Sequence, residues 1–254
     1  MTDPRTLATR LDEAIRTAHA TTQLTSEVPL SLADAYAVQR AGVDLRSRRD
    51  DPPVGMKLGF TSTAKAAQMG VFDVIAGVLT AGMRVADGGT ADLPLIHPRI
   101  EPELAFLVGD GVHGGDLTTA VVAVAPAAEI IDSRYRNFSF TLEDVVADNA
   151  SAAAFAIGPW QDFTAARALD LGNLGVVLEV DGTVVQAGST AAILGHPLRA
   201  LEVCARMVRE HGFVLPAGSV VLAGAATAAV PLTAGAVVEA SVTGLGRVTV
   251  RAAS

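Results

Sequence analysis

The sequence predicts an α+β protein in which a mixed β-sheet is rolled or folded into a sandwich, with helices outside it. Helical periodicity is concentrated near the N-terminus, short strand-like runs fill most of the remainder, and strands do not alternate regularly with helices. We therefore expect an N-terminal helical arm over residues 1–52 and a main domain over residues 53–254. The chain of 254 residues is long enough for a sizeable core.

Two helices form the predicted arm. Residues 5–20 repeat apolar side chains at helical spacing. A second helix is expected over residues 31–48, because Ser31 and Asp34 resemble a capping box and a double proline follows. The arm precedes the strand-rich part of the chain as a separate helical segment.

The main domain is predicted to consist mainly of short strands. Strands are expected at residues 54–60, 96–108, 219–224, 236–242 and 247–252, and a hairpin at residues 176–188. The hairpin turns at Asp181-Gly182, a pair that accepts the positive φ angles of a tight turn.

Three further segments complete the main domain. Helices are expected at residues 63–69 and 197–211, ended by Gly70 and Gly212. Residues 121–131 are apolar throughout, and periodicity does not distinguish a strand from a helix there.

Composition and charge narrow the classes of function. The net charge is −8 and Lys and Arg form no stripe, which argues against nucleic-acid binding. An acidic protein that handles anions must concentrate positive charge locally, through a metal or placed Lys and Arg. Cys204 is the only cysteine, which indicates a reducing compartment, the cytoplasm. The first twenty residues do not resemble a signal peptide, and no apolar run approaches the roughly 20 residues of a membrane span.

Two glutamates two residues apart, Glu101 and Glu103, are the first candidate site residues. In an extended segment both side chains leave the same face. The flanking Pro98 and Pro102 predict an edge strand or a bulge, because proline cannot donate to a β-ladder. Adjacent carboxylates repel each other and a divalent cation removes that repulsion, with oxygen ligands favouring Mg²⁺, Mn²⁺ or Ca²⁺ over zinc. The alternative is a solvated strand face.

Glu129 is a third candidate ligand. It lies in the otherwise apolar run PAAEII, where a glutamate is seldom buried without a partner. The alternative is an ion pair with Arg134 or Arg136. One metal ion held by Glu101, Glu103 and Glu129 would explain all three acids together.

Other polar residues in apolar surroundings are weaker candidates. Lys57, in GMKLGF, is either a general acid or substrate clamp, or a lysine that extends to the surface. The run DNAS, residues 148–151, is a turn or helix cap, or presents a hydroxyl to a ligand. His97, His196 and Cys204 are expected to be structural. The chain contains no GxGxxG, Walker or GxSxG motif.

Five segments carry a family resemblance: KLGFTSTAKAAQMGV, IHPRIEPELAFLVG, PAAEIIDSRYRNFSF, VVADNASAAAFAIG and LGHP. In this order, over nearly the whole chain, they resemble the 2-oxopent-4-enoate hydratases and 4-oxalocrotonate decarboxylases of the fumarylacetoacetate hydrolase superfamily. The resemblance implies a rolled, mixed β-fold in a catalytic domain over residues 53–254. It implies Mg²⁺ or Mn²⁺ bound by Glu101, Glu103 and Glu129. It also implies catalytic roles for Lys57 and Ser151, and substrate contacts from Ile75, Leu79, Ser151 and Thr227.

A few positions separate the two activities of this family, and the runs IDSRYRNF and TAAV (residues 227–230) resemble the decarboxylases more closely. Hydratases carry a D-x-P-D-F-G pattern, and decarboxylases have an apolar residue where its second Asp falls; here Ile75 takes that place. Val74 and Ala76 depart from both groups, which usually have a proline and an aromatic residue there. We therefore expect decarboxylation of 2-oxohex-3-enedioate (4-oxalocrotonate) to 2-oxopent-4-enoate in aromatic meta-cleavage degradation. The alternatives are a 2-oxopent-4-enoate hydratase, a lyase for a related 2-oxo acid of a specialised pathway, and a non-catalytic partner subunit.

The resemblance also implies partners. A small 2-oxo acid is the expected substrate, and the chain is expected to form a homo-oligomer and a complex with a paralogous hydratase. Neither nucleic acid nor a membrane is an expected partner.

Overall fold

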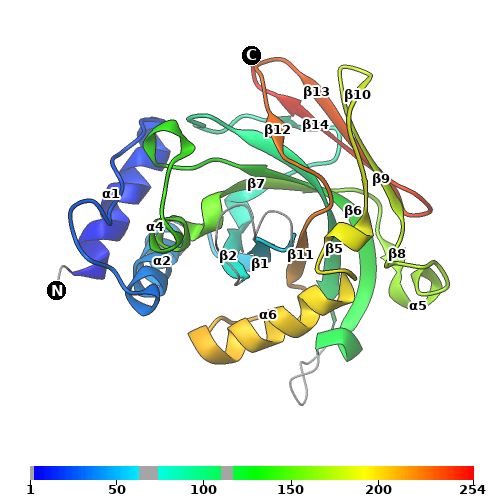
Figure 1. The fold of residues 1–254 in the computed structure, drawn as a ribbon, viewed down its shortest axis with the longest axis horizontal. Coiled ribbons are helices and arrows are strands. Elements are labelled where there is room, and N and C mark those ends of the chain that lie inside the picture. The colour runs from blue at the N-terminus through cyan, green and yellow to red at the C-terminus, as the bar shows by residue number, and fades with distance from the viewer. Residues whose placement is uncertain (1–2, 63–73, 110–116) are drawn as a thin grey trace.

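Two β-sheets form the body of the protein in the computed structural model, which describes residues 3–62, 74–109 and 117–254 (Figure 1). The larger, nine-stranded sheet has the order β2 (Ile75–Thr80), β1 (Pro53–Gly59), β11 (Val220–Ala225), β5 (Arg99–Val108), β6 (Val121–Ile131), β7 (Ala152–Ile157) and β3 (Arg84–Val85), with β12 (Val230–Pro231) paired to β5 and β8 (Gln161–Asp162) paired to β6. The smaller, five-stranded sheet has the order β10 (Thr183–Ser189), β9 (Gly175–Val180), β13 (Val237–Val242), β14 (Gly246–Ala252) and β4 (Thr90–Ala91). Parallel pairs interrupt the antiparallel pairing in each sheet, which confirms the predicted mixed β-structure.

Hydrophobic clusters hold the layers together. One cluster joins the two sheets and includes Ile100 and Ala128 of the larger sheet and Leu178 and Val248 of the smaller sheet. Helix α6 (Leu198–His211) lies along the larger sheet (Figure 1), where the sulfur atoms of Cys204 and Met56 are 3.8 Å apart. Burial raises the pKa of the Cys204 thiol to about 12, in agreement with the predicted structural role.

The N-terminal helices gather beside β2 and the short helix α4 (Leu142–Ala147) (Figure 1). Helix α1 (Pro4–Thr17) is shorter than the predicted helix at residues 5–20, because Ala18 adopts a left-handed conformation with φ of 51° and closes it. Helix α2 (Leu32–Ser47) begins with the predicted capping box of Ser31 and Asp34.

The two N-terminal helices share a hydrophobic cluster with the strands. Leu11 of α1 and Tyr36 of α2 belong to the same cluster as Ile75 of β2 and Val145 of α4. The division into an arm and a main domain at residue 52 stays a prediction. Within the described residues, no helix is long and apolar enough to cross a membrane.

Most strand predictions in the main domain are confirmed. The ambiguous residues 121–131 form β6, which lies between β5 and β7 and is buried on both faces, so its sequence shows no alternation. The hairpin of β9 and β10 turns at Asp181 and Gly182, whose φ angles are 50° and 75°. The helix predicted at residues 63–69 lies outside the described residues.

One part of the prediction about β5 is wrong. Its prolines indicated an edge strand or a bulge, and β5 is not an edge strand, because it lies between β11 and β6. The irregularity occurs in its partner, because the pairing of β11 with β5 shifts register between Leu222 and Ala225. Pro102 has no N–H to donate, but its carbonyl accepts from the Ala226 N–H at 2.9 Å. The register shift in β11 therefore lies beside this proline.

The remaining elements are short. They comprise α5 (Phe163–Ala166) and single turns at Ala81–Met83, Leu117–Thr119, Arg136–Phe138, Asn149–Ser151 and Thr190–Ala192. The turns at Arg136–Phe138 and Asn149–Ser151 contain residues with positive φ, and both contribute residues to the cavity that holds the site.

Candidate metal centre

Three buried carboxylates meet on strands β5 and β6. Glu101 lies directly opposite Glu129 in the register of these strands, and Glu103 follows two residues later on the same face of β5. One carboxylate oxygen from each lies within 4.8 Å of the others. Their exposed fractions are 7%, 1% and 0%, which excludes a solvated strand face.

The electrostatics of this cluster fit a divalent cation. Burial raises the pKa of Glu103 well above its ordinary value, and the charges of Glu129 and Glu101 add to the rise. Burial also raises the pKa of Glu129 to about 7, against the lowering effect of Lys57. Glu103 Oε2 accepts from the N–H of Gly224 at 2.8 Å. Glu103 Oε1 and Glu129 Oε1 have no hydrogen-bond partner among the described residues, so both remain available as oxygen ligands for a cation.

Lys57 lies beside these carboxylates. It is 3% exposed, so it does not extend to the surface. Its ammonium lies 3.1 Å from Glu129 Oε2 in an ion pair and donates to the carbonyl of Ala150 at 3.1 Å. Burial lowers the pKa of Lys57, but Glu129, Glu101 and Glu103 outweigh it, and the pKa is raised overall. Lys57 is therefore a cation at neutral pH, and it replaces Arg134 and Arg136 as the observed partner of Glu129.

The DNAS run forms a left-handed turn over the site. Asn149, Ala150 and Ser151 have φ angles of 54°, 52° and 57°. This left-handed conformation is unfavourable for most residues other than Gly and Asn. The Ala150 carbonyl accepts from Lys57. Ser151 Oγ is buried and has no hydrogen-bond partner in the described part of the chain.

Asn149 fastens this turn to strand β2. Its carboxamide accepts from the Val78 N–H at 2.7 Å and donates to the Val78 carbonyl at 2.8 Å. Gly77 allows the close approach, because a Cβ there would lie 2.6 Å from the Asn149 carbonyl oxygen and 3.1 Å from Lys57 Cδ. The turn, β2 and Lys57 thus form one packed unit.

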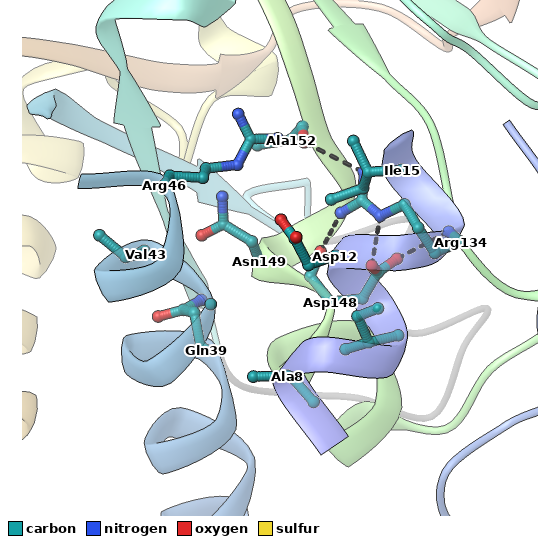
Figure 2. Close-up of a pocket in the computed structure, with 13 residues that line it drawn as sticks. Ala8, Asp12, Ile15, Gln39, Val43, Arg46, Arg134, Asp148, Asn149 and Ala152 are labelled. Carbon is teal, nitrogen blue, oxygen red and sulfur yellow. Dashed lines mark hydrogen bonds and ion pairs between the residues drawn. The ribbon is translucent and has the colours of Figure 1, made fainter. Parts of the chain in front are cut away.

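Buried Arg134 bonds to the residues on both sides of the turn at residues 149–151. Arg134 forms an ion pair with Asp148 and donates to the carbonyls of Asp132, Asp148 and Ala152. Burial raises the pKa of Asp148 to about 6, although Arg134 opposes the rise. Figure 2 shows these groups around a cavity of about 30 Å³ that Gln39 and Arg46 of helix α2 also line. The N-terminal helices therefore back the turn that carries Ser151.

A second, larger cavity of about 390 Å³ reaches the carboxylate cluster at Glu101. Lys57, Glu101, Ile75 and Ser151 line it, so the structure brings these four predicted site residues together. Ile75 and Lys57 both approach Gly59, where an added Cβ would lie 2.9 Å from Ile75 Cγ1 and 3.9 Å from Lys57 Nζ.

Two predicted substrate contacts lie outside this lining. Leu79 is 1% exposed and packs in a core cluster with Met83 and Phe155. Thr227 donates to the Ala228 carbonyl at 3.2 Å, and its neighbour Ala228, not Thr227 itself, lines the cavity.

The predicted structural histidines have structural contacts. His196 Nδ1 accepts from the Leu198 N–H at the start of α6. The His97 N–H donates to Asp132 at 2.8 Å, and the His97 ring packs on Phe138 with centroids 5.2 Å apart.

Arg99 and Phe138 are among the residues of the larger cavity that sequence reasoning missed. Arg99 had a usable signal, since it precedes Glu101 by two residues and so shares its face of the strand. Phe138 had none, because its position depends on a turn with positive φ at Asn137 and Phe138.

Comparisons with known proteins agree with this fold. Residues 63–252 match the family described as fumarylacetoacetate (FAA) hydrolase C-terminal. The chain is 48% identical over 245 residues to a 4-oxalocrotonate decarboxylase from a Pseudomonas species, covering 94% of each chain. It is 37% identical over 249 residues to a 2-keto-4-pentenoate hydratase from Burkholderia vietnamiensis, covering 95% of this chain and 94% of the relative.

A solved structure extends the similarity to three dimensions. The 4-oxalocrotonate decarboxylase from Pseudomonas putida G7, complexed with magnesium and adipate, matches with a TM-score of 0.92 and 40% identity, covering 98% of this chain and 97% of that chain. Because the sequence and structural matches span almost the entire chain, this protein belongs to the fumarylacetoacetate hydrolase family, as its motifs predicted.

Proposed function

We propose that this protein is a divalent-metal-dependent lyase that decarboxylates 2-oxohex-3-enedioate (4-oxalocrotonate) to 2-oxopent-4-enoate. The observation that carries the proposal is the set of buried, convergent oxygens of Glu101, Glu103 and Glu129 beside Lys57, in a cavity with an apolar residue at Ile75. The 48% identity to a 4-oxalocrotonate decarboxylase supports the same substrate class.

The three glutamates are the residues that would hold the cofactor. A bound Mg²⁺ or Mn²⁺ would act as a Lewis acid that polarises the keto group of the 2-oxo acid. Magnesium in the solved relative supports this choice of cation. The three carboxylates would otherwise repel one another inside the sheet, and Lys57 offsets only one of their charges.

Lys57 and Ser151 are the proposed catalytic residues. Loss of CO₂ from C6 leaves an electron pair at C5 that delocalises through the C3–C4 double bond toward the C2 oxygen, and a proton must later return to the carbon chain. Lys57 holds protons in the cavity on an ammonium fixed by Glu129 and the Ala150 carbonyl. Ser151 Oγ, buried at the same cavity with no hydrogen-bond partner among the described residues, offers a donor to an oxygen of the substrate.

Ile75 favours decarboxylation over hydration. Its apolar side chain lines the same cavity as Lys57, so position 75 supplies no base to activate water. An aspartate at this place would repel a dianionic substrate and supply such a base. The 2-oxopent-4-enoate hydratase is the second candidate, because a hydratase from Burkholderia vietnamiensis shares 37% identity with the chain.

Two other functions fit less well. A non-catalytic partner subunit has no need of three buried glutamates and a buried lysine at one cavity. A lyase for a related 2-oxo acid would use the same residues, and Val74 and Ala76, which depart from the family pattern, lie next to Ile75.

The remaining expectations on partners and location stay proposals. We propose a homo-oligomer in the cytoplasm that also associates with a paralogous hydratase. The single cysteine supports a reducing compartment, and the net charge of −8 argues against nucleic acid.

The test follows two reactions separately on the isolated protein with Mg²⁺. Release of CO₂ from 2-oxohex-3-enedioate should be the main activity, and hydration of 2-oxopent-4-enoate should be weak. Ile75→Asp should lower CO₂ release roughly 100-fold or more, because a carboxylate beside the dianion costs several kcal/mol. Ile75→Asn is the matched control, because asparagine has nearly the same shape as aspartate but no charge. It should retain more activity than Ile75→Asp. Rapid hydration without CO₂ release by the natural protein would decide for the hydratase.

A further inference from the structure

The larger cavity contains a second cation, Arg99, that the proposed reaction does not yet use. Arg99 opens strand β5, two residues before Glu101 and on the same face. In the register of β5 and β6, Arg99 stands opposite Ile131 and Glu101 opposite Glu129. Two residues of strand span about 6.6 Å, so the backbone of Arg99 is separated from that of Glu101 by a distance similar to the length of a short carbon chain.

The guanidinium of Arg99 is held in place by an aromatic platform. Its Cζ lies 4.8 Å from the centre of the Phe138 ring. His97 and Phe140 pack on Phe138 with ring centroids 5.2 Å and 5.9 Å away. Asn137 and Phe138 keep φ angles of 59° and 55°, so this turn has a defined, unusual shape. A guanidinium on a fixed ring is oriented before any ligand arrives.

Arg99 is also uncommitted to an anion. Other arginines near the cavities have acidic partners: Arg46 pairs with Asp51, Arg49 with Asp12 and Arg134 with Asp148. Within residues 3–62, 74–109 and 117–254, the Arg99 side chain forms neither an ion pair nor a hydrogen bond, and it lines the cavity.

The charges around the cavity indicate what Arg99 could bind. The three glutamates carry three negative charges, which Lys57 and a divalent cation would balance in full. With the three glutamates, Lys57 and the cation together neutral, Arg99 is the remaining positive charge in the described cavity lining. A dianionic substrate brings one carboxylate to the 2-oxo end and a second carboxylate at the far end of its chain, and that second charge needs a counter-charge away from the cluster.

We propose that Arg99, positioned by Phe138, binds the distal carboxylate of the substrate and so selects dianionic over monoanionic 2-oxo acids. This inference rests on the proposed function for the identity of the substrate. A guanidinium suits the role because it donates two parallel hydrogen bonds to one carboxylate.

The test compares two unreactive ligands that differ only at the far end. 2-Oxohexanedioate and 2-oxohexanoate have the same carbon chain but lack the C3–C4 double bond, so neither offers the path for decarboxylation. Their affinities for the Mg²⁺-loaded protein are measured by titration calorimetry. The natural protein should bind the dioate more tightly. Arg99→Gln should weaken the dioate about 10- to 100-fold and leave 2-oxohexanoate within about twofold, because only the dioate loses a charge-assisted hydrogen bond.

Two further variants sharpen the result. Arg99→Lys should keep part of the preference, since it retains the charge without the bidentate geometry. Arg136→Gln is the matched control: Arg136 is an exposed arginine of the same turn that is outside the cavity lining, and its loss should change neither affinity. Equal weakening of both ligands by Arg99→Gln, or no weakening, would overturn the inference. Arg99-dependent binding of the dioate by a protein that releases no CO₂ would refute the proposed function and leave the inference standing.

Discussion

At the scale of single residues, Lys57 carries the most direct prediction. A buried ammonium held by Glu129 and the Ala150 carbonyl is fixed beside the cavity, as a general acid must be. Lys57→Met should lower kcat for 2-oxohex-3-enedioate about 10²- to 10⁴-fold, the usual cost of losing such a group. Metal content, measured on the same protein, should stay normal because the three glutamates remain. A near-normal kcat at full metal content would reduce Lys57 to a structural residue.

The same scale shows what the sequence can predict about a site. The spacing of Glu101 and Glu103 places both on one face of a strand without knowledge of the fold. The position of Glu129 opposite Glu101 is a cross-strand register, set by packing between segments nearly thirty residues apart, and spacing does not reveal it. The apolar surroundings of Glu129 suggested a metal shared with Glu101 and Glu103, and the family motifs then implied the same three ligands. They did not supply Arg99, although its spacing from Glu101 follows the same rule.

At the scale of elements, the left-handed turn of residues 149–151 and strand β2 act as one unit. Asn149→Ala should remove both hydrogen bonds to Val78, leave a buried N–H unpaired and place alanine in a left-handed conformation. The expected loss of unfolding free energy is about 1–3 kcal/mol. Because the turn also positions the Ala150 carbonyl and Ser151, kcat should fall roughly 10- to 100-fold.

A control separates positioning from stability in this variant. The affinity for Mg²⁺ should not change, because the glutamates lie on β5 and β6. Asn149→Asp keeps the acceptor for the Val78 N–H and should lie between the natural protein and Asn149→Ala in both stability and kcat. Variants that lose stability yet keep the natural kcat would contradict the positioning role.

Elements whose signals are local were predicted well, and those decided by neighbours were not. The capping box at Ser31 and the Asp181-Gly182 turn depend on a few adjacent residues and are found as predicted. Strand β6 was ambiguous, because burial on both faces removes the alternation that marks a strand. The edge assignment of β5 was wrong, because a shift in its partner β11 absorbs Pro102, a feature that exists only once the two strands pair.

At the scale of the whole molecule, the N-terminal helices and the strands meet at the site. Gln39 of α2 donates to the Ala76 carbonyl at 2.7 Å and to the Val146 carbonyl at 3.2 Å, so it joins β2 to α4. Arg134 pairs with Asp148, just before the turn at residues 149–151 (Figure 2), and donates to the carbonyl of Asp132, just after β6. The helices predicted as a separate arm thus brace the residues that line the cavity, and local unfolding of α2 would disturb Ile75 and Ser151 together.

Stability should depend on metal and pH through the carboxylates buried in the larger sheet. The folded metal-free protein holds the pKa of Glu129 at about 7, above its ordinary 4.5. The folded state then keeps a proton that the unfolded chain releases between these values. The contribution of Glu129 to the free energy of unfolding is therefore largest below about pH 4.5 and falls as the pH rises to about 7. A bound cation favours the charged carboxylate and reverses this dependence.

Thermal unfolding should reveal this reversal. The difference in Tm between Mg²⁺-saturated and metal-free protein should grow from about pH 5 to about pH 7.5, because the metal-free form weakens while the cation binds charged glutamates more tightly. Glu129→Gln keeps the shape of the side chain but has no titrating carboxyl, so the metal-dependent difference should largely disappear at every pH. A difference in Tm that is independent of pH, or that persists undiminished in Glu129→Gln, would place the metal somewhere other than on Glu101, Glu103 and Glu129.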